Sequence, residues 1–255
     1  MFSRRWWWTT LIVILGIGLA IRLGIWQLDR NTDRRSNVRH IQALKNLPSL
    51  NLNILPIPDD FSEMEYRHVT VSGTYDFEHQ VALRNQVWTQ SWGDESGYAL
   101  LTPLILSDGR AVMIERGWIP SHYDSRATWQ QFNEPGPVTI DGIIRLPMKK
   151  GEMGGGVPDP TLAPGETGLD FWNFVNLSRL QQQMPYPLLD VYIQEAPSIN
   201  PETLPYRWLS QPDLSTGAHI GFALMWFFYA GLLLFGYPRW LKKQKSNALQ
   251  EDGDG

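Results

Sequence analysis

The sequence contains no cysteine among its 255 residues. This absence excludes disulfides, zinc–thiolate sites, iron–sulfur clusters, covalent haem attachment through Cys-x-x-Cys-His and thiol-based copper transfer. Basic residues are also in the minority: 22 Lys and Arg stand against 26 Asp and Glu, a formal net charge of −4. Because nucleic-acid binding needs a basic face, we expect no nucleic acid as a partner.

Long apolar runs are present near both ends of the chain. The first covers residues 6–28 with one charge, Arg22, whose long stem can reach the membrane interface; the second covers 219–237. About 20 apolar residues cross a bilayer core of roughly 30 Å as a helix. The second run is followed directly by a basic cluster of Arg239, Lys242, Lys243 and Lys245. The positive-inside rule therefore predicts that both termini are cytoplasmic and that the lipid bilayer holds both ends.

Small residues recur at every fourth position in both runs. Gly16, Ala20 and Gly24 do so in the first, and Gly217 and Gly221 at the start of the second. Such spacing lets two membrane helices pack together, so we predict contact between the spans. The alternative is the ordinary abundance of glycine in membrane helices.

Between the runs, alternating apolar residues predict a mainly β domain. Asp108-Gly109 between two apolar segments is a strong hairpin signal. We expect strands at 66–75, 81–87, 98–106, 111–119, 138–146, 171–175 and 188–194, and a short helix at 178–184. The predicted fold is an antiparallel barrel-like or sandwiched sheet with short helices, flanked by two transmembrane α-helices.

These patterns divide the chain into five parts. They are an N-terminal transmembrane anchor (1–29), a helical and proline-rich linker (30–65), an extracytoplasmic β domain (66–216), a C-terminal transmembrane helix (217–240) and a cytoplasmic tail (241–255).

Enzymatic signals are weak, and we expect no catalytic residues. The glycine-rich segment 151–156 lacks the Gly-Lys-Ser/Thr ending of a phosphate-binding loop. Ser121, His122 and Asp124 are the residue types of a hydrolase triad, but sequence neighbours do not converge on one reacting atom.

One histidine differs from the others by position. His219 opens the second span, and Ala223, Trp226 and Ala230 continue its helical face. An imidazole at the hydrocarbon edge can ligate a porphyrin iron, in which case Trp226 would lie against the ring and Arg22 or Arg30 would pair with a propionate. The alternative is an interfacial histidine hydrogen-bonded to water or lipid headgroups.

Five blocks, in order, resemble the Surfeit-locus family of cytochrome c oxidase assembly factors. They are 23–30 (LGIWQLDR), 67–75 (RHVTVSGTY), 97–104 (GYALLTPL), 116–120 (RGWIP) and 219–227 (HIGFALMWF). Three positions depart from the family pattern: Ala218 replaces an Asn, Phe222 a Tyr and Glu115 an Asn.

The resemblance implies a non-enzymatic chaperone of the respiratory chain that assists haem insertion into the oxidase catalytic subunit. It implies haem a as cofactor, with His219 as the metal ligand, and haem-synthesis enzymes as further partners. The alternative is a membrane-anchored scaffold that binds oxidase subunits without touching haem. Only five residues precede the tryptophans at 6–8, and we therefore expect a bacterial plasma membrane, with two spans.

Overall fold

The computed structural model describes residues 7–58, 60–90, 93–148, 157–162, 168–197, 203–215 and 217–251. The chain forms two compact units. Residues 1–40 and 213–255 make a helical unit, and residues 41–212 make a β unit. The statements below concern each unit by itself.

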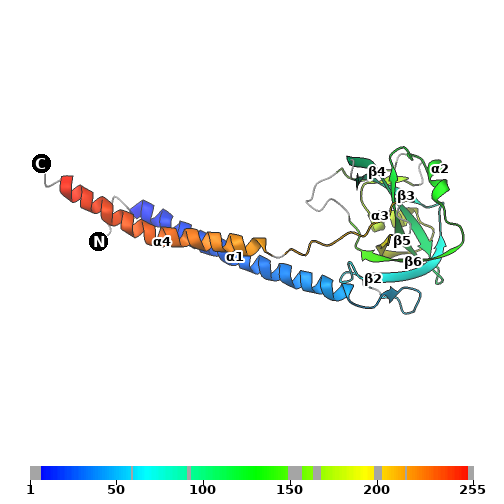
Figure 1. The fold of residues 1–255 in the computed structure, drawn as a ribbon, viewed down its shortest axis with the longest axis horizontal. Coiled ribbons are helices and arrows are strands. Elements are labelled where there is room, and N and C mark those ends of the chain that lie inside the picture. The colour runs from blue at the N-terminus through cyan, green and yellow to red at the C-terminus, as the bar shows by residue number, and fades with distance from the viewer. Residues whose placement is uncertain are drawn as a thin grey trace. The chain divides into compact units, whose positions relative to one another are not determined.

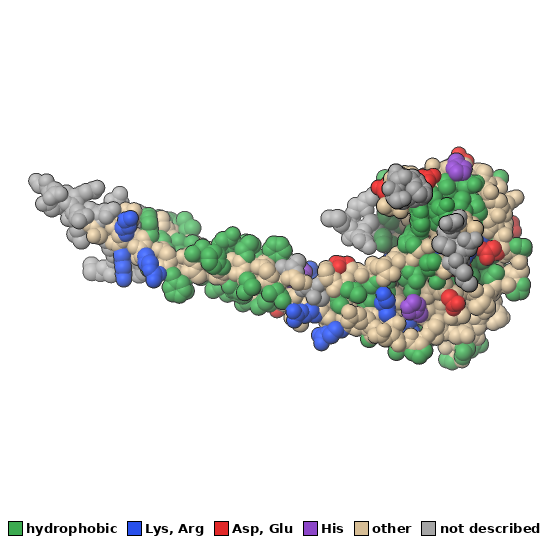
Figure 2. Space-filling view, in the orientation of Figure 1, with side chains coloured by type: hydrophobic (Ala, Val, Ile, Leu, Met, Phe, Trp, Pro, Cys, Tyr) green, Lys and Arg blue, Asp and Glu red, His purple; other side chains and the backbone are tan. Residues whose placement is uncertain are grey.

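The helical unit contains two long helices, α1 (Trp7–Lys45) and α4 (Ala218–Glu251). Both are long and apolar enough to cross a membrane. Most of their apolar side chains face outward and cover the helix surface, with Lys and Arg side chains near the ends of this apolar stretch (Figures 1 and 2). Apolar surface of this extent is unfavourable in water and favourable in lipid. The chain thus has the two candidate spans that its sequence predicts.

The two helices contact each other in antiparallel register. The Thr10 hydroxyl lies 2.8 Å from the Tyr237 hydroxyl. A Cβ added at Gly24 would lie 2.6 Å from the Phe227 ring, so the glycine leaves room for that ring. Ala20 is buried as well. The predicted contact between the spans is confirmed.

The small residues predicted for α4 are not the ones that pack. Among the described residues, no heavy atom outside the helix's own backbone and chain neighbours lies within 4 Å of a Cβ added at Gly217 or Gly221. Ala223 and Ala230 are buried instead. The pair lies seven residues apart, two helical turns, and so on one face. That part of the prediction is wrong because Gly217 precedes the helix and Gly221 faces outward.

In its described residues, the β unit contains eight strands and two short α-helices. They are β1 (Leu50–Asn51), β2 (His68–Tyr75), β3 (Val81–Gln90), β4 (Gly93–Ile105), β5 (Ala111–Pro120), α2 (Arg126–Trp129), β6 (Pro137–Arg145), β7 (Phe171–Trp172), α3 (Leu177–Leu180) and β8 (Leu188–Glu195). All seven predicted strands are present, and the predicted helix at 178–184 corresponds to α3 with the 3₁₀ turn Gln181–Gln183 that follows it. Sequence patterning does not predict β1, since two residues are too short to show a period.

Five of these strands close into a ring. β2 pairs with β6, β6 with β8, β8 with β5 and β5 with β4, and β4 returns to β2 through Thr74 and Tyr75. β3 and β7 extend the sheet beyond β4, and β1 lies beside β2 (Figure 1). The barrel-like fold is confirmed. Its sheet is mixed, because β1–β2, β3–β7 and β5–β8 are parallel.

The hairpin between β4 and β5 forms where Asp108-Gly109 predicts it. Gly109 has φ +85°, a left-handed conformation that glycine adopts without strain. All ten residues of β5 are buried, so this strand is central to the sheet.

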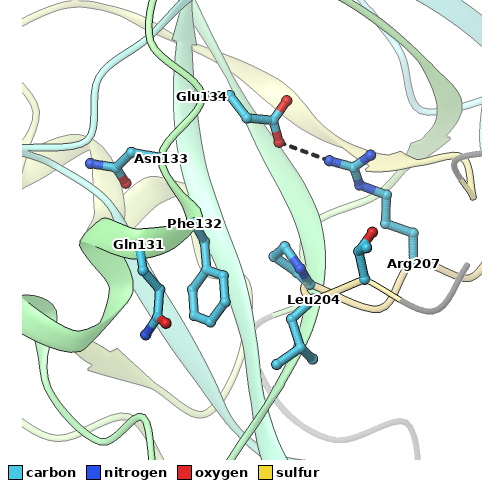
Figure 3. A pocket seen from close by; sticks show the side chains of 8 residues that line it. Gln131, Phe132, Asn133, Glu134, Leu204 and Arg207 are labelled. Carbon is cyan, nitrogen blue, oxygen red and sulfur yellow. Dashed lines mark hydrogen bonds and ion pairs between the residues drawn. The ribbon is translucent and has the colours of Figure 1, made fainter. Parts of the chain in front are cut away.

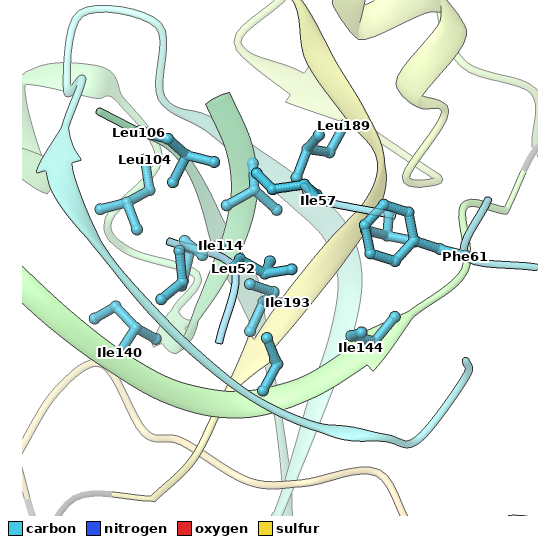
Figure 4. Close-up of a cluster of buried hydrophobic side chains, with 14 of the residues drawn as sticks. Leu52, Ile57, Phe61, Leu104, Leu106, Ile114, Ile140, Ile144, Leu189 and Ile193 are labelled. Carbon is cyan, nitrogen blue, oxygen red and sulfur yellow. The ribbon is translucent and has the colours of Figure 1, made fainter. Parts of the chain in front are cut away.

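Apolar side chains fill the barrel (Figure 4). Val71, Ile114 and Ile193 come from three different strands, and Leu52 and Phe61 come from the segment between α1 and β2. That segment is therefore part of the core. Burial of one such side chain stabilises a fold by about 1.5–3 kcal/mol.

Candidate functional site

His219 lies at the start of α4 and contacts α1. It is half-buried, and its Nδ1 lies 2.9 Å from Oε1 of Gln27. The two residues are 192 positions apart in the chain. The antiparallel pairing of the helices brings them together.

An open groove of about 510 Å³ adjoins this contact. A volume of this size is within the range of small-molecule sites. His219 contributes from α4, and the α1 side chains are Trp26, Arg30, Asp33, Arg34 and Asn37. Trp26, Arg30, Asp33 and Asn37 are spaced by four, three and four residues, so they share one helical face. An imidazole, an indole and two guanidinium groups therefore line a single groove.

The two arginines of the groove have different environments. Arg34 forms an ion pair of 2.7 Å with Asp213 and donates from Nε to the Ser215 carbonyl at 3.2 Å. The Ser215 amide donates to the Asp213 carboxylate at 2.9 Å, and this hydrogen bond lowers the pKa of Asp213. Arg30 instead has its guanidinium carbon 5.9 Å from the centre of the Trp26 ring. Arg34 thus holds the segment that leads into α4, while Arg30 forms no ion pair with a carboxylate among the residues that the structure describes.

The structure places two of the four predicted site residues together. His219 and Arg30 line the groove. Arg22 is exposed and lies eight residues before Arg30, about 12 Å along α1. Trp226 is half-buried, contacts Tyr229 edge-on at 6.2 Å and is not among the lining residues. Sequence reasoning does not predict three of the lining residues, Trp26, Asp33 and Asn37. Their spacing from Arg30 places them on the same helical face, and this pattern could have identified them.

The β unit contains a second polar cluster, around Arg116 of β5. This side chain is fully buried, and its guanidinium lies over the rings of Tyr75 at 4.8 Å and Phe77 at 5.3 Å. It donates to Gln80 at 3.3 Å and to Glu134 at 3.0 Å. A buried cation of this kind needs such partners, because an unpaired charge inside a protein costs several kcal/mol, about 3–5.

Arg207 connects this cluster to the segment that leads toward α4. Its Nη2 donates to Glu134 at 3.0 Å (Figure 3). Its Nε donates to the Arg116 carbonyl at 3.2 Å. Nε also lies 3.3 Å from Glu195. A cavity of about 310 Å³ lies beside Glu134 and Arg207. Arg207 therefore attaches the chain that leaves the barrel to strands of the barrel itself.

Burial changes the acidity of the carboxylates near these arginines. Desolvation raises the pKa of Glu195 to about 7, and the Arg207 charge partly opposes that rise. Burial also raises the pKa of Glu115, against a hydrogen bond from Gln194 at 3.0 Å. The charge of Glu134 adds to the rise in the pKa of Glu195. Glu195 pairs with Arg207, and Glu115 accepts from Gln194, so the arrangement is that of a structural clamp.

The described residues offer no catalytic or metal constellation. Ser121, His122 and Asp124 are exposed, and the His122 ring lies 4.1 Å from that of Tyr123. Within the described ranges no group of three or more His, Asp or Glu is arranged to hold a metal ion. The glycine-rich segment 151–156 lies outside the described residues.

Two helices long and apolar enough to cross a membrane, together with a five-stranded barrel, fit the class of two-span, membrane-anchored proteins with a β-barrel domain. The sequence profile of the SURF1 family matches residues 14–231. The chain belongs to the SURF1 family.

Several named proteins are similar to this chain. A SURF1-like protein of Rickettsia felis is 25% identical over 229 residues, which cover 89% of this chain and 94% of that protein. Surfeit locus protein 1 of Arabidopsis thaliana is 18% identical, covering 88% of this chain and 75% of its own length. A SURF1-like protein of Caenorhabditis elegans is 28% identical over 62% of this chain. The match spans only 54% of the nematode protein.

Proposed function

We propose that this protein is an assembly factor for haem–copper cytochrome c oxidase that assists haem insertion into the catalytic subunit. Membership of the SURF1 family and the two candidate spans support this proposal. The proposal places the protein in a bacterial plasma membrane with both termini cytoplasmic and the barrel outside. The basic residues that follow the apolar part of α4 support this orientation. The protein acts as a chaperone and not as an enzyme.

The groove beside His219 is the proposed site for haem a. When bound, haem would supply an iron that an imidazole nitrogen can coordinate and two propionate carboxylates that suit guanidinium groups. The groove contains both kinds of partner, since His219 and Arg30 line it together. That juxtaposition is the observation that carries the proposal. Trp26, held under Arg30, supplies an aromatic face.

The geometry favours Arg30 over Arg22 as the propionate partner, because Arg22 is not among the lining residues. Similarly, Trp26 lines the groove and Trp226 does not. His219 would hold the ligand at the α4 end, and Arg30 would bind its charged edge from α1. Asn37, two turns beyond Arg30 on the same face, adds a polar group at the outer end of the groove.

The test is haem a binding by the detergent-purified full-length protein. We expect His219→Ala to lose the shifted Soret band and most of the bound haem, and Arg30→Ala to weaken binding about tenfold or more. His122→Ala is the matched control, since it removes an exposed histidine of the barrel unit. Unchanged haem content in His219→Ala would remove this histidine from the role.

One observation favours a second function, a scaffold for oxidase subunits that does not bind haem. Ala223 and Ala230, which continue the helical face of His219, are buried, so this face of α4 is closed to a ligand beyond the first turn. Co-purification with the oxidase catalytic subunit separates the two functions. The scaffold is supported if the His219→Ala variant co-purifies with the catalytic subunit as well as the wild type does, and if the wild-type protein contains no haem.

A further inference from the structure

The side chain of Gln27 contacts the imidazole on which the proposed function depends. Its Oε1 lies 2.9 Å from Nδ1 of His219, a normal hydrogen-bond distance. Both side chains are half-buried, so water competes only partly for this bond. Gln27 contacts the histidine but is not among the residues that line the groove.

Contacts on the membrane side hold the two residues opposite each other. Gly24 lies one turn before Gln27 on α1, and the Phe227 ring occupies the space that a side chain at Gly24 would fill. On the other side, Arg34 binds Asp213, which precedes α4. The Gln27–His219 bond therefore lies between two independent contacts that fix the register of the helices. These contacts hold the two stretches of backbone, and with them the two side chains, in facing positions.

This bond decides which imidazole nitrogen carries the proton. A glutamine Oε1 only accepts hydrogen bonds, so with this oxygen facing the ring the partner Nδ1 carries a hydrogen. Of the two neutral tautomers, the bond therefore selects the one with Nδ1–H. The lone pair then lies on Nε2. A hydrogen bond to the far nitrogen fixes tautomer and ring orientation in the same way for many metal-binding histidines.

We infer that Gln27 is a positioning residue for His219, which holds Nδ1–H and leaves Nε2 as the nitrogen that binds the iron. The inference deepens the proposed function and rests on it for the identity of the ligand. The tautomer itself does not depend on haem and can be measured without it. A glutamine turned so that its NH₂ group donates to Nδ1 would give the opposite tautomer, with Nε2 protonated and closed to a metal.

The first experiment is nitrogen NMR of the haem-free, full-length protein labelled with ¹⁵N at its histidine rings. Subtraction of the His219→Ala spectrum isolates the signals of His219 from those of the other four histidines. We expect a protonated Nδ1 and an unprotonated Nε2 in the wild type. Gln27→Leu should shift the tautomer ratio roughly fivefold toward Nε2–H, the size expected for loss of one neutral hydrogen bond.

Two further variants separate positioning from structural damage. Gln27→Glu keeps an acceptor oxygen and should retain the Nδ1–H form. Gln42→Leu changes an exposed glutamine of the same helix and should leave the ratio at its wild-type value. An unprotonated Nδ1 in the wild type, or a ratio that Gln27→Leu does not change, would overturn the inference.

The second experiment uses the protein loaded with haem a and measures its reduction potential. A carboxylate accepts the Nδ1 proton more strongly and makes the imidazole a better electron donor, so Gln27→Glu should lower the potential. Gln27→Leu should raise it. Shifts in the same direction would contradict the positioning role. If His219→Ala retained its haem, the proposed function would fail, while the NMR result would still decide the role of Gln27.

Discussion

Arg207 Nε lies 3.3 Å from Oε2 of Glu195, and this ion pair connects the chain leaving the barrel to the end of its last strand, β8. Arg207 also binds Glu134, which binds the fully buried Arg116. The residue before Arg207 forms a two-way backbone pair with β5, since Trp118 and Tyr206 exchange amide–carbonyl bonds of 2.8 Å. The clamp therefore combines backbone and charged contacts within a few residues.

The buried carboxyl of Glu195 makes the stability of the barrel depend on pH. Its pKa is about 4.5 in the unfolded chain and about 7 in the folded one. Between these values the unfolded chain releases the proton while the folded chain keeps it, so stability falls as pH rises from about 4.5 to 7 and then levels off. The difference corresponds to about 3 kcal/mol.

Glu195→Gln removes this titration. We expect the variant to be about 2–3 kcal/mol more stable than the wild type at pH 8 and nearly equal to it at pH 4.5. Urea unfolding of the full-length protein in detergent, followed by near-UV circular dichroism, measures both values. Glu78→Gln changes an exposed carboxylate and is the control. A wild type more stable than Glu195→Gln at pH 8 would contradict the assignment.

Arg116→Met should destabilise the barrel strongly. The substitution removes the guanidinium that packs on Tyr75 and Phe77 and leaves the buried Gln80 without that donor, while Glu134 keeps Arg207 at 3.0 Å. A buried polar group that loses its hydrogen-bond partner costs about 1–3 kcal/mol, and the lost packing of the Arg116 side chain adds to this. Arg84→Met, at an exposed position over the Phe171 ring, should cost less than about 1 kcal/mol. Equal midpoints in urea for the two variants would show that Arg116 is not part of the clamp.

Gly24→Leu should separate the two membrane helices. A Cβ at this position already lies 2.6 Å from the Phe227 ring, so a leucine cannot fit without moving α4. Gly18→Leu is the matched control, since no neighbouring side chain lies within 4 Å of a Cβ there among the described residues. The double variant Gly24→Leu/Phe227→Ala should regain the contact between the two helices, because removal of the Phe227 ring makes room for the leucine.

Cross-linking between introduced cysteines measures this separation. The sequence has no native cysteine, so only the introduced thiols can react. Thr10→Cys and Tyr237→Cys place thiols on facing positions, and a short bismaleimide should join them in the parent and in Gly18→Leu. The yield should fall several-fold in Gly24→Leu. Equal yields in all backgrounds would mean that Gly24 does not set the helix contact.

Thiol labelling in intact cells tests the proposed orientation. Ser125→Cys introduces one thiol at the start of α2 in the barrel, and Ser246→Cys introduces one at an exposed position near the end of α4. A membrane-impermeant maleimide should label the first from outside and should reach the second only after lysis. The reverse pattern would place the barrel in the cytosol and overturn the proposed site of action.

Sequence patterning predicts most of the secondary structure because its signals are local. The period of two in 68–75 follows from a strand with one buried face, and the burial of Val69 and Val71 agrees with it. The Asp108-Gly109 turn depends on glycine at positive φ, a property of the residue itself. The parallel pairing of β5 with β8 is not predictable in this way. Nearly all residues of both strands are buried, so the order of apolar residues looks the same for a parallel and an antiparallel pair.

The same division applies to the candidate site. His219 stands out by its place at the edge of an apolar run, where an imidazole can either ligate a metal or hydrogen-bond to water and lipid headgroups. The choice between Arg22 and Arg30 cannot be made from charge and depth alone, since it depends on which face of α1 each occupies beside α4. Trp26 and Gln27 enter the site only because α4 packs against their turn of the helix.

The sequence by itself determined the two candidate membrane helices, the strands of the barrel and the β4–β5 hairpin. The length of an apolar run, the period of apolar residues in a strand and the chemistry of a turn are all properties of residues near one another in the chain. Only the tertiary structure decided that the strands close into a ring, that Arg116 and Glu195 share a buried network, and that Gln27 meets His219. These contacts join residues far apart in the chain, and their partners are selected by the packing of whole elements.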